Sequence, residues 1–232
     1  VGVALSEATS IGAMLCTSVD ARIGAYFPRL KDHIRENTHL LVSLVPQQNV
    51  EAFKTLMIDA GGQVELVLDD AARVAFKLPH GFDFSYNHTT LQVLKADRSA
   101  TYQQVGCPIP PDPHAIADLR PKLGDDVWMH HEFARVGGEI VTFDLPIVWY
   151  STPERLAEIN ATYEANGFPV YDAHTWRVEG GGLKPDYTHL AWKKRMDPLG
   201  LLNAPKSRFW PDVKDMAPDD IAALGNTEGA VA

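Results

Sequence analysis

The stretch that decides the fold is residues 127–150, which read VWMHHEFARV-GG-EIVTFDLPIVWY. Both arms of this stretch are rich in β-branched and aromatic residues, which favours two strands. The dipeptide Gly137-Gly138 between them is typical of a tight hairpin turn. Pro146 cannot donate a backbone hydrogen bond, so it predicts an edge position or a bulge in the second strand.

The flanking residues add two helices and two strands to this hairpin. Residues 101–105 (TYQQV) are a strand candidate, and residues 114–123 are a helix candidate. After the hairpin, Thr152 can cap a helix over residues 152–166, and residues 174–178 form a last strand candidate. The predicted order is therefore β-α-β-β-α-β, the split unit of ferredoxin-like folds.

A shorter β-α-β pattern precedes this unit. Residues 40–45 (LLVSLV) read as a strand, residues 46–60 have helical spacing of apolar residues, and residues 63–68 (QVELVL) alternate as a half-buried strand does. Together the two patterns predict an α+β fold, a ferredoxin-like antiparallel sheet with helices on one face. Residues 189–196 (HLAWKKRM) predict an additional helical segment near the C-terminal end.

The composition is that of a globular protein and argues against nucleic acid as a partner. Of the 232 residues, 45% are hydrophobic and 22% charged, so a folded core is expected. The formal net charge is −9, and the basic residues are scattered. Binding to a phosphate backbone needs a basic stripe or patch, so nucleic acid is not an expected partner.

Neither a membrane span nor a disulfide framework is predicted. No uncharged apolar run approaches the length of about 18 residues that a spanning helix needs. Cys16 and Cys107 lie far apart and belong to no CxxC pattern. A cytoplasmic protein is the simplest expectation, because unpaired cysteines fit a reducing compartment.

The most informative motif follows the helix at residues 189–196. Residues 197–206 read DPLGLLNAPK, which is similar to the C-terminal signature of the FAD-linked oxidase family, a pattern close to DPxGLLNPGK. The family belongs to the vanillyl-alcohol oxidase superfamily. We expect Pro198 to end the helix, Gly200 to supply a turn, and Leu201 with Leu202 to anchor the segment in the core. The resemblance implies that Asn203 and Lys206 touch the edge of the flavin.

Other stretches resemble one bacterial branch of this family and extend the likeness over roughly residues 75–210. The stretches are YNHTTLQVLK at residues 86–95, TYQQ at 101–104, HHEFAR at 130–135 and HTWRVEGG at 174–181. No GxGxxG loop is present, and the family's glycine-rich segment for the FAD pyrophosphate is missing. The resemblance therefore implies FAD held mainly by a missing domain or a partner chain.

The resemblance also implies a division of the chain. Residues 1–22 would end the missing FAD-binding domain or connect to it, and residues 23–185 would form the cap domain over the substrate. Residues 186–212 would carry the flavin-contacting segment, and residues 213–232 would be a tail. The implied function is oxidation of a small alcohol or 2-hydroxy acid by hydride transfer to FAD. The alternative is a non-catalytic assembly or regulatory subunit that retains the cap fold.

Two histidines are the catalytic candidates. His88 and His174 lie in stretches that match the family, and histidine suits proton transfer near neutral pH. The alternative for each is a buried histidine bonded to backbone. Asn87 could orient His88 or bind a substrate oxygen, and the alternative is that Asn87 caps a helix.

The substrate-binding candidates are polar residues near the hairpin. His130 and Glu132 share one face of their strand and would suit a substrate cleft, although a solvent face is the alternative. Arg135 and Arg177 could clamp a substrate carboxylate, or form ordinary ion pairs. Tyr150 could donate a hydrogen bond to flavin or substrate, or simply pack. The histidine spacing matches no metal motif, so no metal site is predicted.

Overall fold

The hairpin at residues 127–150 forms as predicted in the computed structural model, which describes residues 13, 15–27, 29–35, 38–174, 185–203 and 206–228. Strand β6 (His130–Val136) pairs antiparallel with β7 (Glu139–Asp144), and Val136 lies opposite Glu139. Gly137 and Gly138 have φ angles of 60° and 92°. Positive φ at both central residues is what a two-residue hairpin turn requires, so the turn explains the two glycines.

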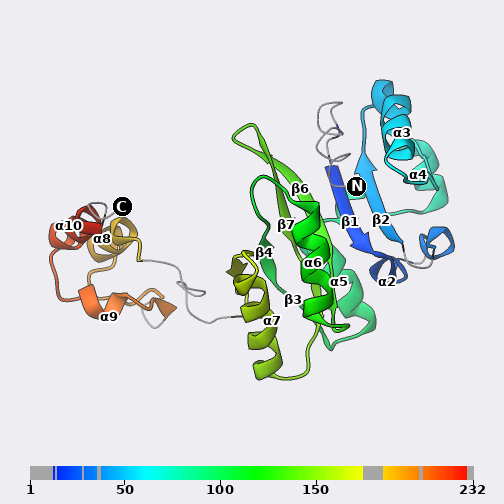
Figure 1. The fold of residues 1–232 in the computed structure, drawn as a ribbon. Helices are drawn as coiled ribbons and strands as arrows, with labels where there is room; N and C mark the ends of the chain where they lie inside the picture. Colours follow the sequence, from blue (N-terminus) through cyan, green and yellow to red (C-terminus); the bar gives the residue numbers. More distant parts are fainter. Residues whose placement is uncertain are drawn as a thin grey trace. The chain divides into compact units, whose positions relative to one another are not determined.

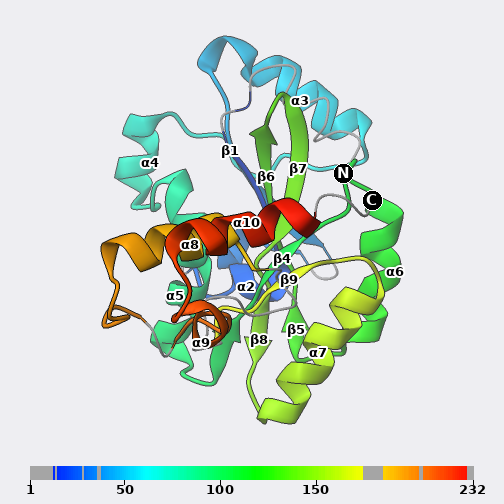
Figure 2. The same ribbon diagram turned by 90° about the vertical axis from the view of Figure 1, so that its left-hand side faces the viewer.

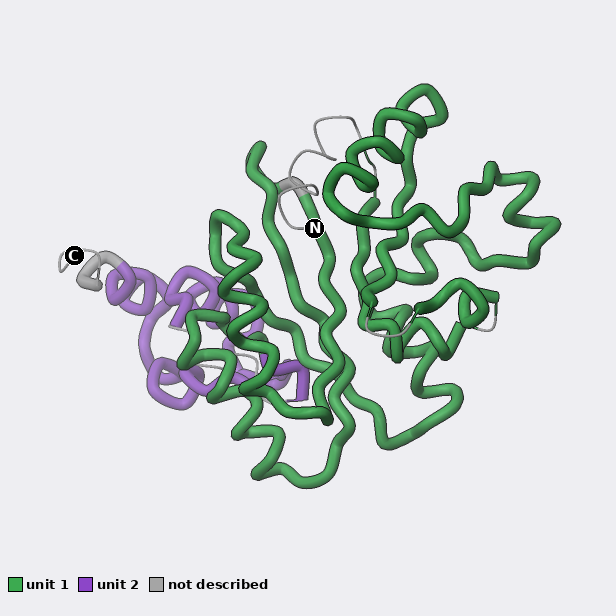
Figure 3. The backbone as a smooth tube through the Cα atoms, turned by 45° about the vertical axis from the view of Figure 1, so that its right-hand side comes forward, with its two compact units in different colours: residues 1–171 green, residues 172–232 purple. Residues whose placement is uncertain are grey.

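The chain divides into two units, residues 1–171 and residues 172–232 (Figure 3), which we describe separately. In unit 1 the hairpin is joined by β4 (Gln104–Gly106), α6 (Pro113–Leu123), α7 (Pro153–Ala165) and β9 (Val170–Tyr171). The strand order is β6-β7-β4-β9, and every pair is antiparallel. This order is that of a split β-α-β ferredoxin-like unit, so the predicted α+β class is confirmed. The last strand is β9 rather than residues 174–178, of which residues 175–178 lie outside the described part.

Helices α6 and α7 cover one face of this sheet. Leu119 and Leu123 of α6 and Ile159 and Tyr163 of α7 are buried in one apolar cluster with Val105 of β4. Figures 1 and 2 show the two helices side by side along the strands. Burial of these side chains is the main favourable contribution to packing the helices on the sheet.

The long strands are interrupted near their middles. Strands β3 (Ala100–Tyr102), β5 (Val127–Trp128) and β8 (Ile147–Trp149) form a second sheet in the order β3-β8-β5. The interruptions fall at Gln103, at Met129 and at the dipeptide Leu145-Pro146. Pro146 was expected to cause an edge position or a bulge, and it lies in the break between β7 and β8, because proline has no N–H for the ladder.

Strands β1 (Leu15–Asp20) and β2 (His39–Leu44) extend the main sheet beyond β6, giving the order β2-β1-β6-β7-β4-β9. All six residues of β1 are buried. Residues 15–20 are therefore part of the sheet of unit 1, whereas the resemblance implied that they end a missing FAD-binding domain or connect to it. Burial on both faces explains this position, because an all-buried strand needs neighbours on both sides.

A second apolar cluster adds helices to the opposite face. It includes residues of α2 (Ala21–Gly24), the 3-10 helix η3 (Gly81–Phe84) and α5 (Asn87–Ala96). Ile147 of β8 belongs to this cluster and the adjacent Val148 to the cluster of α6 and α7. Adjacent strand residues face opposite sides. Helices therefore cover both faces, as Figure 2 shows for α5 and α7, and not only the one face predicted.

The predicted strand at residues 63–68 is wrong. The chain continues from β2 through the short η2 (Gln47–Asn49) into α3 (Val50–Asp59) and later α4 (Asp70–Phe76), with no strand between the two helices. None of residues 38–80 is fully buried. An alternating pattern becomes a strand only where a neighbouring strand pairs with it. No strand pairs with residues 63–68, and the sequence alone could not show this. A further 3-10 turn, η1 (Lys31–His33), precedes β2.

Unit 2 contains α8 (Tyr187–Met196), α9 (Trp210–Val213) and α10 (Pro218–Glu228) around a small core of its own. The core includes Leu190 of α8, Trp210 of α9 and Ile221 of α10. The predicted helix at residues 189–196 is thus confirmed. Residues 213–232 were expected as a tail, but Val213 and Ile221 are buried and residues 218–228 are helical. In the described ranges no helix is both long enough and apolar enough to cross a membrane.

Candidate functional site

Three polar side chains of unit 1 meet inside the sheet. Thr17 of β1 lies opposite Glu132 of β6 in the antiparallel register, and His130 is two residues away on the same face. The Thr17 hydroxyl donates to Glu132 Oε1 at 2.9 Å and lies 2.8 Å from His130 Nε2. His130 Nε2 lies 2.7 Å from the same Oε1. We call Thr17, His130 and Glu132 the buried polar cluster.

The buried polar cluster also fixes the junction of η3 and α5. The backbone N–H of Tyr86 donates to Glu132 Oε1 at 2.7 Å. Tyr86 has φ of 52°, a conformation that costs free energy for any residue but glycine. Thr89 holds the same junction by donating from its hydroxyl to the carbonyl of Phe84 at 2.7 Å. Glu132 therefore supports a strained backbone position in addition to its partners on the strands.

His130 carries a buried nitrogen with no partner in the described part of the chain. Its side chain is fully buried, and Nδ1 has no hydrogen bond. If the neutral ring donates from Nε2 to Glu132, then Nδ1 keeps an unused lone pair. Leaving such a group unpaired costs about 1–3 kcal/mol. The other bonds of the buried polar cluster therefore have to offset this cost.

A second polar group lies on the other face of the same strands. Asp144 of β7 accepts the Tyr163 hydroxyl of α7 at Oδ2 (2.7 Å) and the backbone N–H of His130 at Oδ1 (3.1 Å). Burial, with the nearby Asp144 charge, raises the pKa of Tyr163 well above its usual range. The sequence reasoning missed Thr17, Asp144 and Tyr163. A charged residue inside the otherwise apolar strand pattern around Asp144 was the one available signal.

His131 should make the stability of the chain depend on pH. Burial lowers the pKa of this imidazole, while Asp144 and Glu132 act in the opposite direction and His130 in the same one. A histidine whose folded pKa lies below its unfolded value stabilises the fold fully above about pH 6.5, and this stability is lost as the pH falls below that value. We therefore expect the urea concentration at the unfolding midpoint to decrease when the pH is lowered from about 8 to about 5.

The variant His131→Gln should flatten that fall in urea midpoint. His189→Gln is the matched control, because the His189 side chain is exposed in unit 2. His39 also has a pKa lowered by burial and by Arg120, so part of the slope should persist in His131→Gln. Equal slopes for His131→Gln and the parent chain would contradict the prediction.

The predicted residues at the start of α5 are not buried in a cleft. His88 is exposed, and its Nδ1 lies 2.8 Å from the carbonyl of Phe82. This corresponds to the backbone-bonded alternative, although His88 is on the surface. Asn87 is the half-buried first residue of α5, and Tyr86 occupies the cap position without a side-chain cap bond. The capping alternative for Asn87 is therefore wrong, and its substrate role stays a prediction.

The predicted pair on β6 does come together. His130 and Glu132 lie on one face, as the strand period required, and bond to each other. Their exposed fractions are 0% and 3%, so the face is neither solvent nor an open cleft. The geometry supports a positioning role through Tyr86 rather than direct contact with a substrate.

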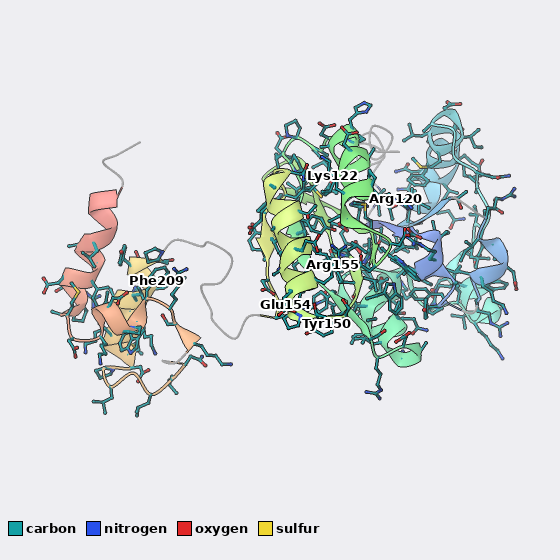
Figure 4. The ribbon with its side chains drawn as sticks, turned by 60° about the horizontal axis from the view of Figure 1, so that its bottom comes forward. Arg120, Lys122, Tyr150, Glu154, Arg155 and Phe209 are labelled. Atoms are coloured by element: carbon teal, nitrogen blue, oxygen red, sulfur yellow. The ribbon has the colours of Figure 1, made fainter. Side chains whose placement is uncertain are left out.

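The remaining candidates are scattered. Tyr150 is exposed at the end of β8, just before α7 (Figure 4). The backbone of Arg135 pairs with Ile140 in the hairpin, whereas its side chain lies outside the described part. Arg177 also lies outside the described residues. In unit 2, His174 is exposed in a turn and donates from its backbone N–H to Asp172 at 2.8 Å.

The motif at residues 197–206 differs from its prediction in one respect. Leu201 and Leu202 were expected in the core, but they are 77% and 69% exposed. Asn203 and Lys206 are exposed as well, and Asn203 has φ of 52°. Asp197 explains the difference, because its carboxylate accepts the backbone N–H groups of Leu201 and Leu202 and thus fixes the turn without burying the side chains.

Comparison with protein-family models and with curated proteins finds no match to this chain. Within the described residues, no group of three or more His, Cys, Asp or Glu side chains is arranged to hold a metal ion.

Proposed function

We propose that this chain is the substrate-side part of an FAD-dependent oxidoreductase that oxidises a small alcohol or 2-hydroxy acid. The FAD would be held by a separate domain or chain, because the sequence contains no glycine-rich phosphate loop. A cytoplasmic location is part of the proposal, since Cys16 and Cys107 are both free thiols.

The observation that carries the proposal is the turn at residues 197–203. Asp197 accepts hydrogen bonds from Leu201 N–H at 2.8 Å and Leu202 N–H at 2.9 Å, and from Lys193 Nζ at 2.7 Å. The hydrogen bond from Lys193, aided by those from the two amides, lowers the pKa of Asp197 to about 2. The turn is therefore held in one conformation at neutral pH.

The fixed turn nevertheless exposes large apolar side chains. Leu199 is 80% exposed, and Leu201 and Leu202 are nearly as exposed. An apolar group presented on an ordered backbone favours contact with another molecule, because leaving it in water costs free energy. A flavin ring edge together with the domain that binds it would cover such a surface.

The residues beside these leucines have the right chemistry for a flavin edge. FAD, when bound, would supply the hydride acceptor. The amide of Asn203 can donate to a ring carbonyl, and the ammonium of Lys206 can place positive charge beside the ring. Both side chains are exposed and thus free to make these contacts once a partner covers the turn.

A second candidate, a non-catalytic assembly subunit, is favoured by the burial of His130 and Glu132. An enzyme needs an acid/base group within reach of its substrate, whereas this pair is enclosed and holds the Tyr86 junction. In this alternative the exposed leucines would dock a protein and contact no cofactor.

The two candidates differ in whether the assembled particle contains flavin. The chain, purified with the polypeptide that co-purifies with it from its source, should show the visible absorption band of oxidised flavin. Anaerobic addition of a small alcohol or 2-hydroxy acid should bleach that band. A colourless assembly would favour the second candidate.

The double variant Leu201→Asp and Leu202→Asp should abolish the flavin-containing assembly. Two carboxylates would have to be desolvated at the contact, and each costs several kcal/mol. The free energy of unfolding of the variant chain alone should differ from that of the parent by less than about 0.5 kcal/mol, because both side chains are exposed. Ile109→Asp is the matched control, since Ile109 is an equally exposed apolar residue of unit 1. Retention of flavin by the double variant would exclude this turn as the contact.

A further inference from the structure

Unit 1 contains a pocket that the proposed function does not use. Its volume is about 310 Å³, and its lining residues are Phe27, Arg29, Lys77, Leu78, Pro79 and Gln92. These residues come from the chain after α2, from the chain after α4 and from α5. Pockets that bind small molecules range from about 300 to 1,000 Å³, so this one suits a small ligand.

Hydrogen bonds and aromatic packing hold the walls of the pocket. Arg73 donates to the carbonyl of Leu78 at 2.8 Å. Gln92 donates from Nε2 to the carbonyl of Tyr26 at 3.1 Å. The ring of Phe27 packs against that of Phe84, with centroids 4.5 Å apart. These contacts hold Leu78, Gln92 and Phe27 in place before any ligand arrives, so mainly the exposed side chains of Arg29 and Lys77 would have to be ordered on binding.

Two cations line the pocket without a partner for their charge. No carboxylate in the described part of the chain forms an ion pair with Arg29 or Lys77. Both side chains are exposed, whereas Phe27 is buried and Leu78 half-buried. The pocket thus combines an apolar floor with a positively charged rim.

The backbone at Lys77 is held in a defined conformation at the end of α4. Lys77 has φ of 57° and ψ of 34°, the left-handed conformation, and ends α4 through bonds from its N–H to the carbonyls of Arg73 and Val74. Glycine or asparagine is usual at such a helix end, because other residues are strained there. The two hydrogen bonds therefore fix the backbone from which the Lys77 side chain extends.

We infer that this pocket binds a small organic carboxylate with an apolar body. The carboxylate would accept charge-assisted hydrogen bonds from Arg29 and Lys77. The apolar part would lie against Phe27, Leu78 and Pro79. This binding function is additional to the proposed oxidoreductase function and does not depend on it.

Calorimetric titration of the full chain with benzoate tests the inference. We expect benzoate to bind with Kd at or below about 1 mM. Benzyl alcohol has the same ring without the charge, and inorganic phosphate has the charge without the ring. Both should bind at least about tenfold more weakly, because each lacks one half of the recognition.

Variants separate the pocket from general surface charge. Arg29→Gln and Lys77→Gly should each raise the Kd for benzoate about tenfold. Lys31→Gln removes a neighbouring positive charge outside the pocket and should leave the Kd unchanged. The melting temperature of Lys77→Gly should be no lower than that of the parent, because glycine adopts the left-handed conformation without strain. That result would show that binding was lost without loss of the fold.

Several outcomes would overturn the inference. Absence of benzoate binding would remove the site altogether. Equal affinity for benzyl alcohol would reduce it to an apolar crevice, and equal affinity for phosphate to a surface anion site. Unchanged benzoate affinity in both Arg29→Gln and Lys77→Gly would place the ligand elsewhere on the chain.

Discussion

Glu132→Ala should lower the free energy of unfolding by about 3–5 kcal/mol, because it removes a buried acceptor and leaves its buried donors without that partner. The donors are the Thr17 hydroxyl, the backbone N–H of Tyr86 and His130 Nε2, and all three converge on one carboxylate oxygen. The Thr17 hydroxyl and His130 Nε2 lie 2.8 Å apart and can still pair, but among the described residues the Tyr86 N–H bonds to Glu132 alone. The loss should also loosen the strained Tyr86 junction, so hydrogen exchange at the start of α5 should become faster.

Two further variants show whether the effect comes from the buried contacts. Glu132→Gln retains an acceptor oxygen and should cost only about 1–2 kcal/mol. Glu139→Ala removes an exposed carboxylate from the same hairpin and should change stability by less than about 0.5 kcal/mol. Urea denaturation of the full chain measures all three. A loss for Glu132→Ala no larger than that for Glu139→Ala would mean that the buried polar cluster does not hold the fold.

Gly200→Ala should unfold unit 2 while leaving unit 1 intact. A Cβ at this position would lie 2.6 Å from Nε1 of Trp210 and 2.9 Å from two further atoms of its ring. Trp210 is buried in the small core of unit 2, so its ring has little room to move. Crowding costs about 1–3 kcal/mol, and the left-handed φ of 65° adds about 1–2 kcal/mol for any residue with a Cβ.

Hydrogen exchange read by mass spectrometry would locate the damage. We expect peptides of α8 and α10 to lose protection in Gly200→Ala, because a core of this size is only marginally stable. Gly137→Ala is the matched control, since Gly137 has φ of 60° and nothing within 4 Å of an added Cβ. It should cost only the conformational strain. Unchanged protection of α8 from hydrogen exchange in Gly200→Ala would show that the Trp210 ring can move to make room for the added Cβ.

If the proposed function holds, Gly200→Ala should also abolish flavin in the assembled particle. The turn at residues 197–203 would no longer be held against α8, so Leu201 and Leu202 could not form one surface. Comparing it with the exposed double aspartate variant separates two causes. One variant removes the shape of the turn, and the other removes only its apolar character.

Local physical chemistry explains the elements that could be predicted. Gly137-Gly138 sets the hairpin because its turn needs two positive φ angles. Thr152 begins α7 as predicted, accepting the backbone N–H of Arg155 at 3.2 Å. These signals act over a few residues, so they can be read without knowing what else is nearby.

The candidate site could be predicted only in part, for the same reason. The strand period placed His130 and Glu132 on one face. Their partner Thr17 is more than a hundred residues away and reaches them only because β1 pairs with β6. Leu201 and Leu202 were expected in the core because they are hydrophobic. They are exposed, because burial requires other residues to pack over the turn.

The amino-acid sequence by itself determined the hairpin turn at Gly137-Gly138, the start of α7 after Thr152, the β-α-β-β-α-β order, and which residues of β6 share a face. Only the tertiary structure decided that β1 joins the sheet, that residues 63–68 do not form a strand, and that His130 and Glu132 are buried. The physical reason is the distance along the chain over which each interaction acts. Caps, turns and side-chain periods are set by neighbours in the chain, whereas strand pairing and burial are set by residues that meet only after folding.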